Sequence, residues 1–212
     1  MSKSPALPRD QRAGQKREQI LDEALNLFAE KGYHGTNIAD IALRLNMGHG
    51  TFYRYFKNKH DIFIEVINLV LRKISVVSLN QNPRAAQTVD DYREQLVGIG
   101  HTFLRLHYED PRLGKVIFYE ALGAGDEVRQ TLDGAFAMTA LVAQEYLKNG
   151  IKKGYLRADL DVAVTARALM AMVMEACRSV VKEADPEAAS RRWMDSIISI
   201  ILGGITTQVV KA

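Results

Sequence analysis

The chain has 212 residues, 47% of them hydrophobic and 25% charged, and its formal net charge is +3. This balance suits a soluble protein of one or two domains, and the single cysteine excludes an internal disulfide, which is typical of a reducing cytoplasm. Residues 1–75 hold 12 Lys and Arg against 8 Asp and Glu, whereas residues 76–212 hold 16 against 17. The positive surplus lies at the N-terminal end, which favours a phosphate-bearing partner there.

Residues 1–15 contain two of the five prolines and no apolar run. They match neither a signal peptide nor a membrane span, and we expect a flexible basic arm over these residues. Two interpretations of Arg9 and Arg12 stay open, namely contact with DNA phosphates or a minor groove, and a disordered tail. Lys16 and Arg17 follow the arm and are further candidate phosphate contacts.

The stretch from Thr36 to Asp61, TNIADIALRLNMGHGTFYRYFKNKHD, predicts two short helices joined by a tight turn and followed by a third helix. Thr36 is predicted to cap the first of them with its hydroxyl. An apolar stripe at helical spacing marks that helix: Ile38, Ile41, Ala42 and Leu45. Asn46 and Gly48 suit the turn, because Asn and Gly tolerate a positive φ angle better than other residues.

The helix expected from about Gly50 has two different sides. Phe52, Tyr55 and Phe56 share one side, and we interpret the two phenylalanines as core residues. The opposite side carries Gly50 and Arg54, flanked by His49, Thr51 and Tyr53. Such a helix fits the major groove of DNA, where Arg bonds guanine, a Thr methyl contacts thymine and Tyr hydroxyls contact phosphates.

The next helix is predicted to start within KNKHD, residues 57–61. Asn58 and Asp61 have the spacing of a capping box, and Lys59 falls in the first turn, where backbone amides favour a phosphate. A solvated face is the alternative interpretation of Lys57 and Lys59.

This order of elements resembles the TetR family of bacterial one-component transcriptional regulators, over about residues 16 to 70. Residues 20–33 resemble the first helix of that family, which closes at Gly32. The positions that fit the family's motif are Thr36, Ile38, Ile41, Ala42, Gly50, Thr51, Phe52, Tyr53, Tyr55, Phe56, Asn58, Lys59 and Ile62. Asn46 stands where the family usually has Gly, and Gly48 replaces a Ser or Thr whose hydroxyl could contact a phosphate.

The resemblance implies a DNA-binding domain over residues 16–75, with its helix-turn-helix at about 37–56. The candidate DNA contacts are Lys16, Arg17, Thr36, Gly48, His49, Gly50, Thr51, Tyr53, Arg54, Tyr55, Lys57 and Lys59.

Beyond this head, the chain continues as helices without strand-like alternation, and the fold class is all-α with about nine helices. Asp110-Pro111 and Asp185-Pro186 each pair an N-cap with Pro at the first helical position. The expected helices cover about residues 59–78, 88–106, 110–125, 126–150 or 126–154, 161–184 and 185–209.

The last two predicted helices are apolar on more than one face, and a helix pair at the end of a small domain would not bury all of these side chains internally. We therefore predict that they pair with their copies in a second subunit as a four-helix bundle, as the resemblance also implies. A two-fold dimer presents two recognition helices to successive major grooves, so the double-stranded DNA operator should be roughly palindromic.

The middle helices are expected to enclose a pocket for a small-molecule inducer within a ligand-binding and dimerisation domain over residues 76–212. Ordinary core packing is the alternative interpretation of most of the candidates. The lining candidates are His101, Phe103, His107, Phe118, Tyr119, Glu120, Phe136, Met170, Met174 and Glu175, with Tyr92 and Tyr146 beside them.

Glu175 is the foremost of these candidates, because a carboxylate in an apolar run must be paired or solvated; Arg178, three residues on, is its alternative partner. His101 and His107 do not share a helical face, so we expect no metal site, and no cofactor is implied. Cys177 lies in the same apolar run and is expected to be a buried thiol.

The sequence thus predicts a cytoplasmic, homodimeric transcriptional repressor that a small inducer releases from DNA, with the helix near 59–78 as the lever between the two halves. Two other classes of protein are the alternatives: a helical protein-interaction adaptor with a vestigial head, and an enzyme. Against an enzyme, the sequence contains no paired nucleophile and base, no phosphate-binding Gly-rich loop and no metal-ligand spacing. Activation in place of repression is a third alternative.

Overall fold

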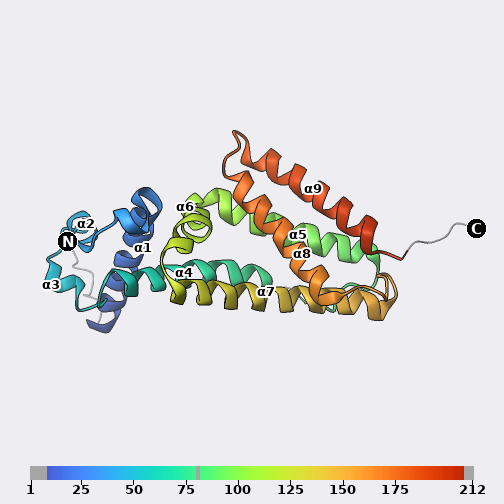
Figure 1. The fold of residues 1–212 in the computed structure, drawn as a ribbon, viewed down its shortest axis with the longest axis horizontal. Coiled ribbons are helices and arrows are strands. Elements are labelled where there is room, and N and C mark those ends of the chain that lie inside the picture. The colour runs from blue at the N-terminus through green and yellow to red at the C-terminus, as the bar shows by residue number, and fades with distance from the viewer. Residues whose placement is uncertain (1–8, 80–81, 208–212) are drawn as a thin grey trace, which may run out of the picture. The chain divides into compact units, whose positions relative to one another are not determined.

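The computed structural model describes residues 9–79 and 82–207, and within these ranges it contains nine α-helices and no strand (Figure 1). This confirms the all-α fold. The helices are α1 Arg9–Gly35, α2 Ile38–Arg44, α3 His49–Phe52, α4 Lys59–Leu79, α5 Val89–Glu109, α6 Pro111–Lys115, α7 Asp126–Lys153, α8 Val162–Val180 and α9 Pro186–Ile205.

The described chain falls into two compact units. The first, which we call the head unit, comprises residues up to 70 together with 115–129, and the second, the C-terminal unit, comprises 71–114 and the residues from 130 on. The head unit is therefore larger than the N-terminal segment alone, because a segment from the middle of the chain packs with it. Helices α4 and α7 each contribute residues to both units.

Local capping chemistry sets several helix starts where the sequence predicts them. Thr88 caps α5 in a capping box with Asp91, whose carboxylate in turn accepts from the Thr88 amide. Asp161 and Asp185 cap α8 and α9 by accepting from the amides three residues on. A side-chain oxygen at the N-cap satisfies an amide that the helix itself leaves unpaired, which is why these positions end the preceding loops.

Two expectations about helix extent need correction. Residues 9–15, expected within a flexible arm, form the first turns of α1; residues 1–8 lie outside the described residues. The single helix expected over 110–125 is instead α6, followed by a π-helical turn, Val116–Glu120, and a 3₁₀ turn, Ala121–Gly123. This change of winding buries Val116 and Ala121 completely while Glu120 reaches the backbone of α1.

An aromatic cluster lies at the centre of the head unit. Phe28 and Phe63 make an edge contact with their ring centroids 4.8 Å apart, and Phe52 and Phe56 complete a core in which these phenylalanines are almost fully buried. Helix packing of this kind holds α3 in place, because its buried side is anchored in the same core.

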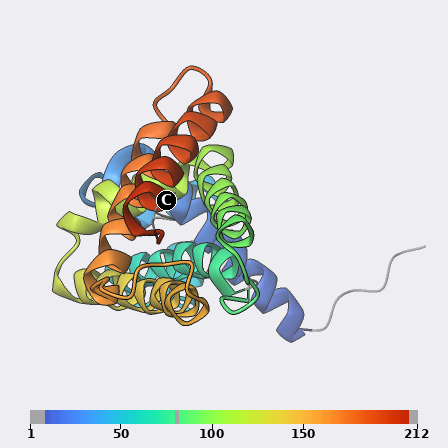
Figure 2. The same ribbon diagram turned by 90° about the vertical axis from the view of Figure 1, so that its right-hand side faces the viewer.

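In the C-terminal unit, α5 packs against both α8 and α9, and α8 against α9. Figure 2 shows α9, in red, beside α5, in green. Across the described residues, none of the helices combines the length and apolar character required to cross a bilayer.

Candidate DNA-binding and ligand-binding sites

The cap of α2 is not the residue that the sequence suggests. Asn37 is the N-cap and forms a capping box with Asp40. Thr36 is completely buried, and its hydroxyl donates to the carbonyl oxygens of Gly32, at 2.8 Å, and Leu27, at 3.1 Å. Thr36 therefore closes the end of α1 and offers no surface to DNA, which corrects its place among the candidate contacts.

The turn between α2 and α3 uses its two unusual residues differently. Asn46 has a φ angle of 47°, the left-handed conformation expected there. Gly48, at φ −70° and ψ 147°, is the extended N-cap of α3 and does not require the freedom of glycine. Because Gly48 has no side chain, it can cap α3 only through its backbone.

Helix α3 is short, but hydrogen-bonded turns continue it to Phe56. His49, Gly50, Tyr53 and Arg54 are exposed, and Thr51 and Tyr55 are half-buried. Since Phe52 and Phe56 lie in the core, the candidate readers share the outward side of a firmly anchored helix. This is the arrangement that a recognition helix needs to place side chains in a major groove.

Two of the candidate phosphate contacts are engaged inside the head unit. The Lys59 ammonium donates to the Tyr33 carbonyl at 2.9 Å and lies 4.7 Å from the centroid of the Tyr33 ring. Arg17 pairs with Glu65 at 3.0 Å and covers the Phe56 ring. Both cations therefore connect α1 with α4 or with the segment that precedes α4. The sequence did not indicate this structural use. Lys57, by contrast, is exposed, and Lys16 is half-buried.

These contacts predict different outcomes for two neighbouring lysines. Lys59→Met should lower the free energy of unfolding by about 1–2 kcal/mol, because a charge-assisted hydrogen bond is lost. Lys57→Ala should leave stability unchanged and reduce the slope of log affinity against log salt by about 1, equally for operator and random DNA. Urea unfolding and DNA titrations at several salt concentrations measure both. A salt slope that changes with Lys59→Met and not with Lys57→Ala would reverse these assignments.

The segment 115–129 is bonded to α1 and α4 within the head unit. The Glu120 carboxylate accepts from the Tyr33 amide at 2.9 Å, next to Gly32, whose φ of 78° ends the regular part of α1. A Cβ atom at Gly32 would lie 2.7 Å from this carboxylate, so the contact requires glycine. His60 contacts Glu127 at 3.0 Å. Glu120, proposed above as a ligand contact, thus serves to connect two segments of the head unit.

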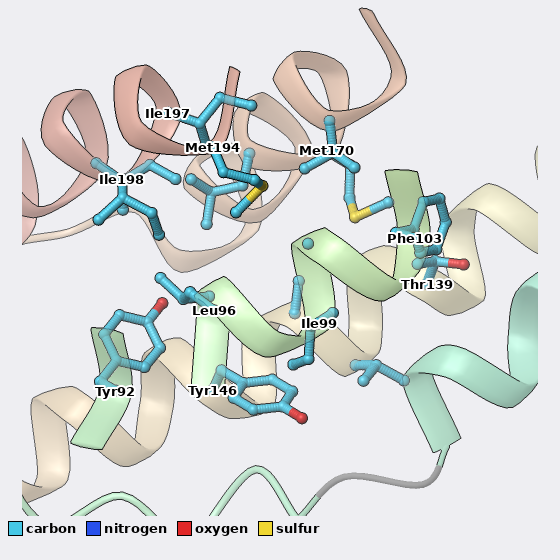
Figure 3. Close-up of a pocket in the computed structure, with 16 residues that line it drawn as sticks. Tyr92, Leu96, Ile99, Phe103, Thr139, Tyr146, Met170, Met194, Ile197 and Ile198 are labelled. Atoms are coloured by element: carbon cyan, nitrogen blue, oxygen red, sulfur yellow. The ribbon is translucent and has the colours of Figure 1, made fainter. Parts of the chain in front are cut away.

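An apolar cavity of about 100 Å³ lies in the C-terminal unit between α5, α7, α8 and α9 (Figure 3). Of the twelve candidates, it brings together Tyr92, Phe103, Tyr146 and Met170. The full lining is Tyr92, Leu96, Ile99, Gly100, Phe103, Thr139, Val142, Ala143, Tyr146, Leu169, Met170, Val173, Met194, Ile197, Ile198 and Ile201.

The remaining candidates do not line this cavity. Glu175 pairs with Arg178, at 2.9 Å, and accepts from the Ser179 hydroxyl at 3.0 Å, so the alternative partner is the one observed. Arg178 holds the pKa of this carboxyl below its ordinary value. His107 is buried and donates to the Phe103 carbonyl, and burial lowers its pKa. The candidates outside the cavity are His101, His107, Phe118, Tyr119, Glu120, Phe136, Met174 and Glu175.

Sequence reasoning missed the contribution of α9 to the cavity. From the sequence, the last two helices are predicted at a subunit interface, and none of their residues is assigned to the pocket except those on α8. Met194, Ile197, Ile198 and Ile201 of α9 are buried within one chain and line the cavity. Periodicity reveals that a helix is apolar and cannot reveal which neighbour covers each face. The thiol of Cys177 is buried as expected, and burial raises its pKa to about 12.

In the part of the chain that the structure describes, no three His, Cys, Asp or Glu side chains are grouped as metal ligands would be. Among the side chains that line the cavity, those of Tyr92, Thr139 and Tyr146 are the ones that carry a hydroxyl. Such a lining favours a ligand that is apolar and that fits the shape of the cavity.

Comparison with known proteins places these two sites in context. Residues 20–66 match the model of the family described as bacterial regulatory proteins, tetR family. The chain is 25% identical over 187 residues to the fatty acid metabolism regulator protein of Bacillus subtilis, an alignment covering 88% of this chain and 94% of that one. Over 67 residues, 31% of this chain and 36% of the other, it is 33% identical to IcaR, a negative transcriptional regulator of the biofilm operon icaADBC in Staphylococcus aureus.

The fold is similar to that of the transcriptional regulator FadR from Bacillus subtilis in complex with stearoyl-CoA, with a TM-score of 0.72 and 25% identity. That similarity covers 86% of this chain and 97% of the other. The segment matched by the family model contains the helix-turn-helix, and the similarity to FadR covers most of the chain. Residues 20–66 are a DNA-binding domain of the TetR family, and the protein is a ligand-responsive, DNA-binding transcriptional regulator.

Proposed function

We propose that this regulator is a repressor, that its effector is a long-chain fatty acyl-CoA, and that the cavity of the C-terminal unit holds the acyl chain. The observation that carries this proposal is the apolar lining, contributed by four helices of one unit. Stearoyl-CoA is the ligand of the FadR structure that the fold resembles, and IcaR is a negative regulator. The proposal places the protein in the cytoplasm, where both operator and acyl-CoA are found.

The extent of the cavity lining supports a linear ligand. Its lining residues on α5 run from Tyr92 to Phe103, which lie eleven positions apart, and at the rise of an α-helix this corresponds to about 16 Å. An apolar lining that follows α5 over this distance fits an extended hydrocarbon chain better than a compact polar effector.

A long acyl chain needs more space than the cavity provides, so binding must displace side chains. Met170 and Met194 are the adaptable members of the wall, because methionine is unbranched and has several rotatable bonds. Met194 packs on Gly100, where any Cβ atom would collide with it. A ligand that binds the rearranged state more tightly than the DNA-binding state would shift the protein away from the DNA-binding state. Helix α4, which contributes to both units, is the proposed lever.

On the DNA side, we propose that the exposed side of α3 reads the operator. Arg54 is the candidate for a guanine edge, Tyr53 and His49 for phosphates or bases, and Lys57 for a phosphate. The operator is proposed to be palindromic because a two-fold homodimer presents two copies of α3.

We propose that α8 and α9 form the homodimer interface through their exposed side chains, whereas their buried side chains pack within one chain. Ile200 is 64% exposed on α9, and it is flanked by Ser196, Ser199 and Gly203, which are small enough for close helix approach. Val164, 62% exposed, is the corresponding apolar residue on α8.

Ile200→Arg should therefore convert the dimer into monomers at micromolar concentration, because a buried, unpaired charge at the interface is strongly unfavourable. Met138→Arg is the matched control, since Met138 is equally exposed, at 64%, on α7. Sedimentation velocity measures whether each variant is a monomer or a dimer. A wild-type monomer, or dissociation by Met138→Arg in place of Ile200→Arg, would overturn the proposed interface.

Ligand binding can be followed through Trp193, the single tryptophan, which precedes the cavity residue Met194. Titration with stearoyl-CoA should change its fluorescence with saturation, whereas coenzyme A alone should not, and octanoyl-CoA should bind more weakly because fewer methylene groups are buried. Binding of coenzyme A as tight as that of stearoyl-CoA, or no binding of any acyl-CoA by fluorescence and calorimetry, would refute the proposed effector class.

A further inference from the structure

Two tyrosines place buried hydroxyls in the wall of the apolar cavity. Tyr92 is fully buried and Tyr146 is 5% exposed. Neither hydroxyl has a hydrogen-bond partner among the described residues. A buried hydroxyl without a partner costs free energy, and a ligand that supplies an acceptor at the right place recovers it.

The two hydroxyls differ in direction. In Figure 3 the Tyr92 oxygen is directed towards Leu96 and Ile198, two residues of the cavity wall, whereas the Tyr146 oxygen is directed away from the side chains of α9. The Tyr92 hydroxyl is therefore the one that can reach a ligand in the cavity.

Tyr92 also marks the end of the cavity that adjoins a polar recess. Its ring lies 5.8 Å from that of Tyr155, which lines a second, open hollow of about 920 Å³, and Ile198 lines both spaces. The Tyr155 hydroxyl already accepts from the Asn149 amide at 3.2 Å. An amphiphile in the cavity would thus have its polar end beside Tyr92.

The polar recess carries charges that suit such an end. Arg93 and Lys153 line it together with the hydroxyls of Thr206 and Thr207, against one carboxylate, Asp195. Lys153 contacts Gln87 at 2.6 Å, so its ammonium is held at the recess by an uncharged partner. Positive groups next to the end of an apolar cavity fit a phosphate-bearing head group.

On the basis of this geometry, we infer that the Tyr92 hydroxyl donates a hydrogen bond to the thioester carbonyl oxygen of the bound acyl-CoA. The inference rests on the effector class proposed above and adds the position of the reactive end of the ligand. It makes Tyr92 the residue that distinguishes an acyl thioester from other lipids with the same chain.

The test compares stearoyl-CoA with S-octadecyl-CoA, a thioether in which a methylene group replaces the carbonyl. The wild-type protein should bind the thioester about tenfold more tightly, the difference expected for one hydrogen bond to a buried hydroxyl. Tyr92→Phe should remove this preference by weakening the binding of stearoyl-CoA alone. Tyr146→Phe is the matched control, and it should retain the full preference.

The outcomes separate the role of Tyr92 from the identity of the effector. Wild-type protein that binds both ligands equally would overturn the role of Tyr92 and leave the acyl-CoA effector intact, whereas binding of neither would overturn both. A loss of affinity for both ligands in Tyr92→Phe, accompanied by a lower melting temperature, would assign Tyr92 a structural role only. Because the wild-type comparison needs no variant, the inference is testable even if Tyr92→Phe does not fold.

Discussion

Ala143→Phe will produce a repressor that binds its operator normally and no longer responds to stearoyl-CoA. Ala143 lines the cavity from α7, and an aromatic ring there occupies the space that the acyl chain needs. If about four methylene groups are excluded, the loss of buried apolar surface is about 3 kcal/mol, or about 100-fold in affinity. Operator titrations with and without stearoyl-CoA measure the effect.

Leu141→Phe is the control for this substitution, because Leu141 lies on the same helix but is 51% exposed and outside the cavity. It should respond to stearoyl-CoA as the wild-type protein does. Full release of Ala143→Phe from DNA by the wild-type concentration of stearoyl-CoA would show that the acyl chain binds elsewhere.

Arg54→Ala will lower affinity for the operator by about 10- to 100-fold and leave affinity for random DNA almost unchanged, because a bidentate Arg–guanine contact contributes about 1–3 kcal/mol of discrimination. Arg54 is exposed in the turn that continues α3, and no hydrogen bond or ion pair within the described residues engages its guanidinium. Competition titrations with operator and random duplexes of equal length provide the measurement.

Arg44→Ala is the matched control on the neighbouring helix. The Arg44 guanidinium bonds Glu23 and Glu30 on α1, so its removal should affect stability and not sequence preference. If Arg54→Ala weakens operator and random DNA to the same extent, Arg54 contacts a phosphate and the base-reading role belongs to another residue of α3.

The features of this fold that are local in sequence could be predicted from it. Thr88 with Asp91, Asp161, and Asp185 followed by Pro186 mark helix starts because each cap is satisfied within three or four residues. The helix-turn-helix was predictable for the same reason, and Asn46 has the positive φ that its turn requires.

The features that depend on contacts distant in sequence could not be predicted. Lys59 contacts the Tyr33 carbonyl 26 positions earlier, and Thr36 contacts Leu27 across the end of α1. Lys and Thr side chains also contact DNA phosphates, so residue type and spacing alone do not distinguish a structural use from a DNA contact. The apolar faces of α9 posed the same difficulty, because burial against α5 and burial against a second subunit require the same side chains.

The most direct test of the whole account is fluorescence anisotropy of the intergenic DNA beside the gene for this protein, with excess random competitor and two salt concentrations. We predict tight binding that survives the competitor and is released by stearoyl-CoA but not by coenzyme A. Binding that random DNA abolishes, or an operator complex that saturating stearoyl-CoA leaves intact, would contradict it.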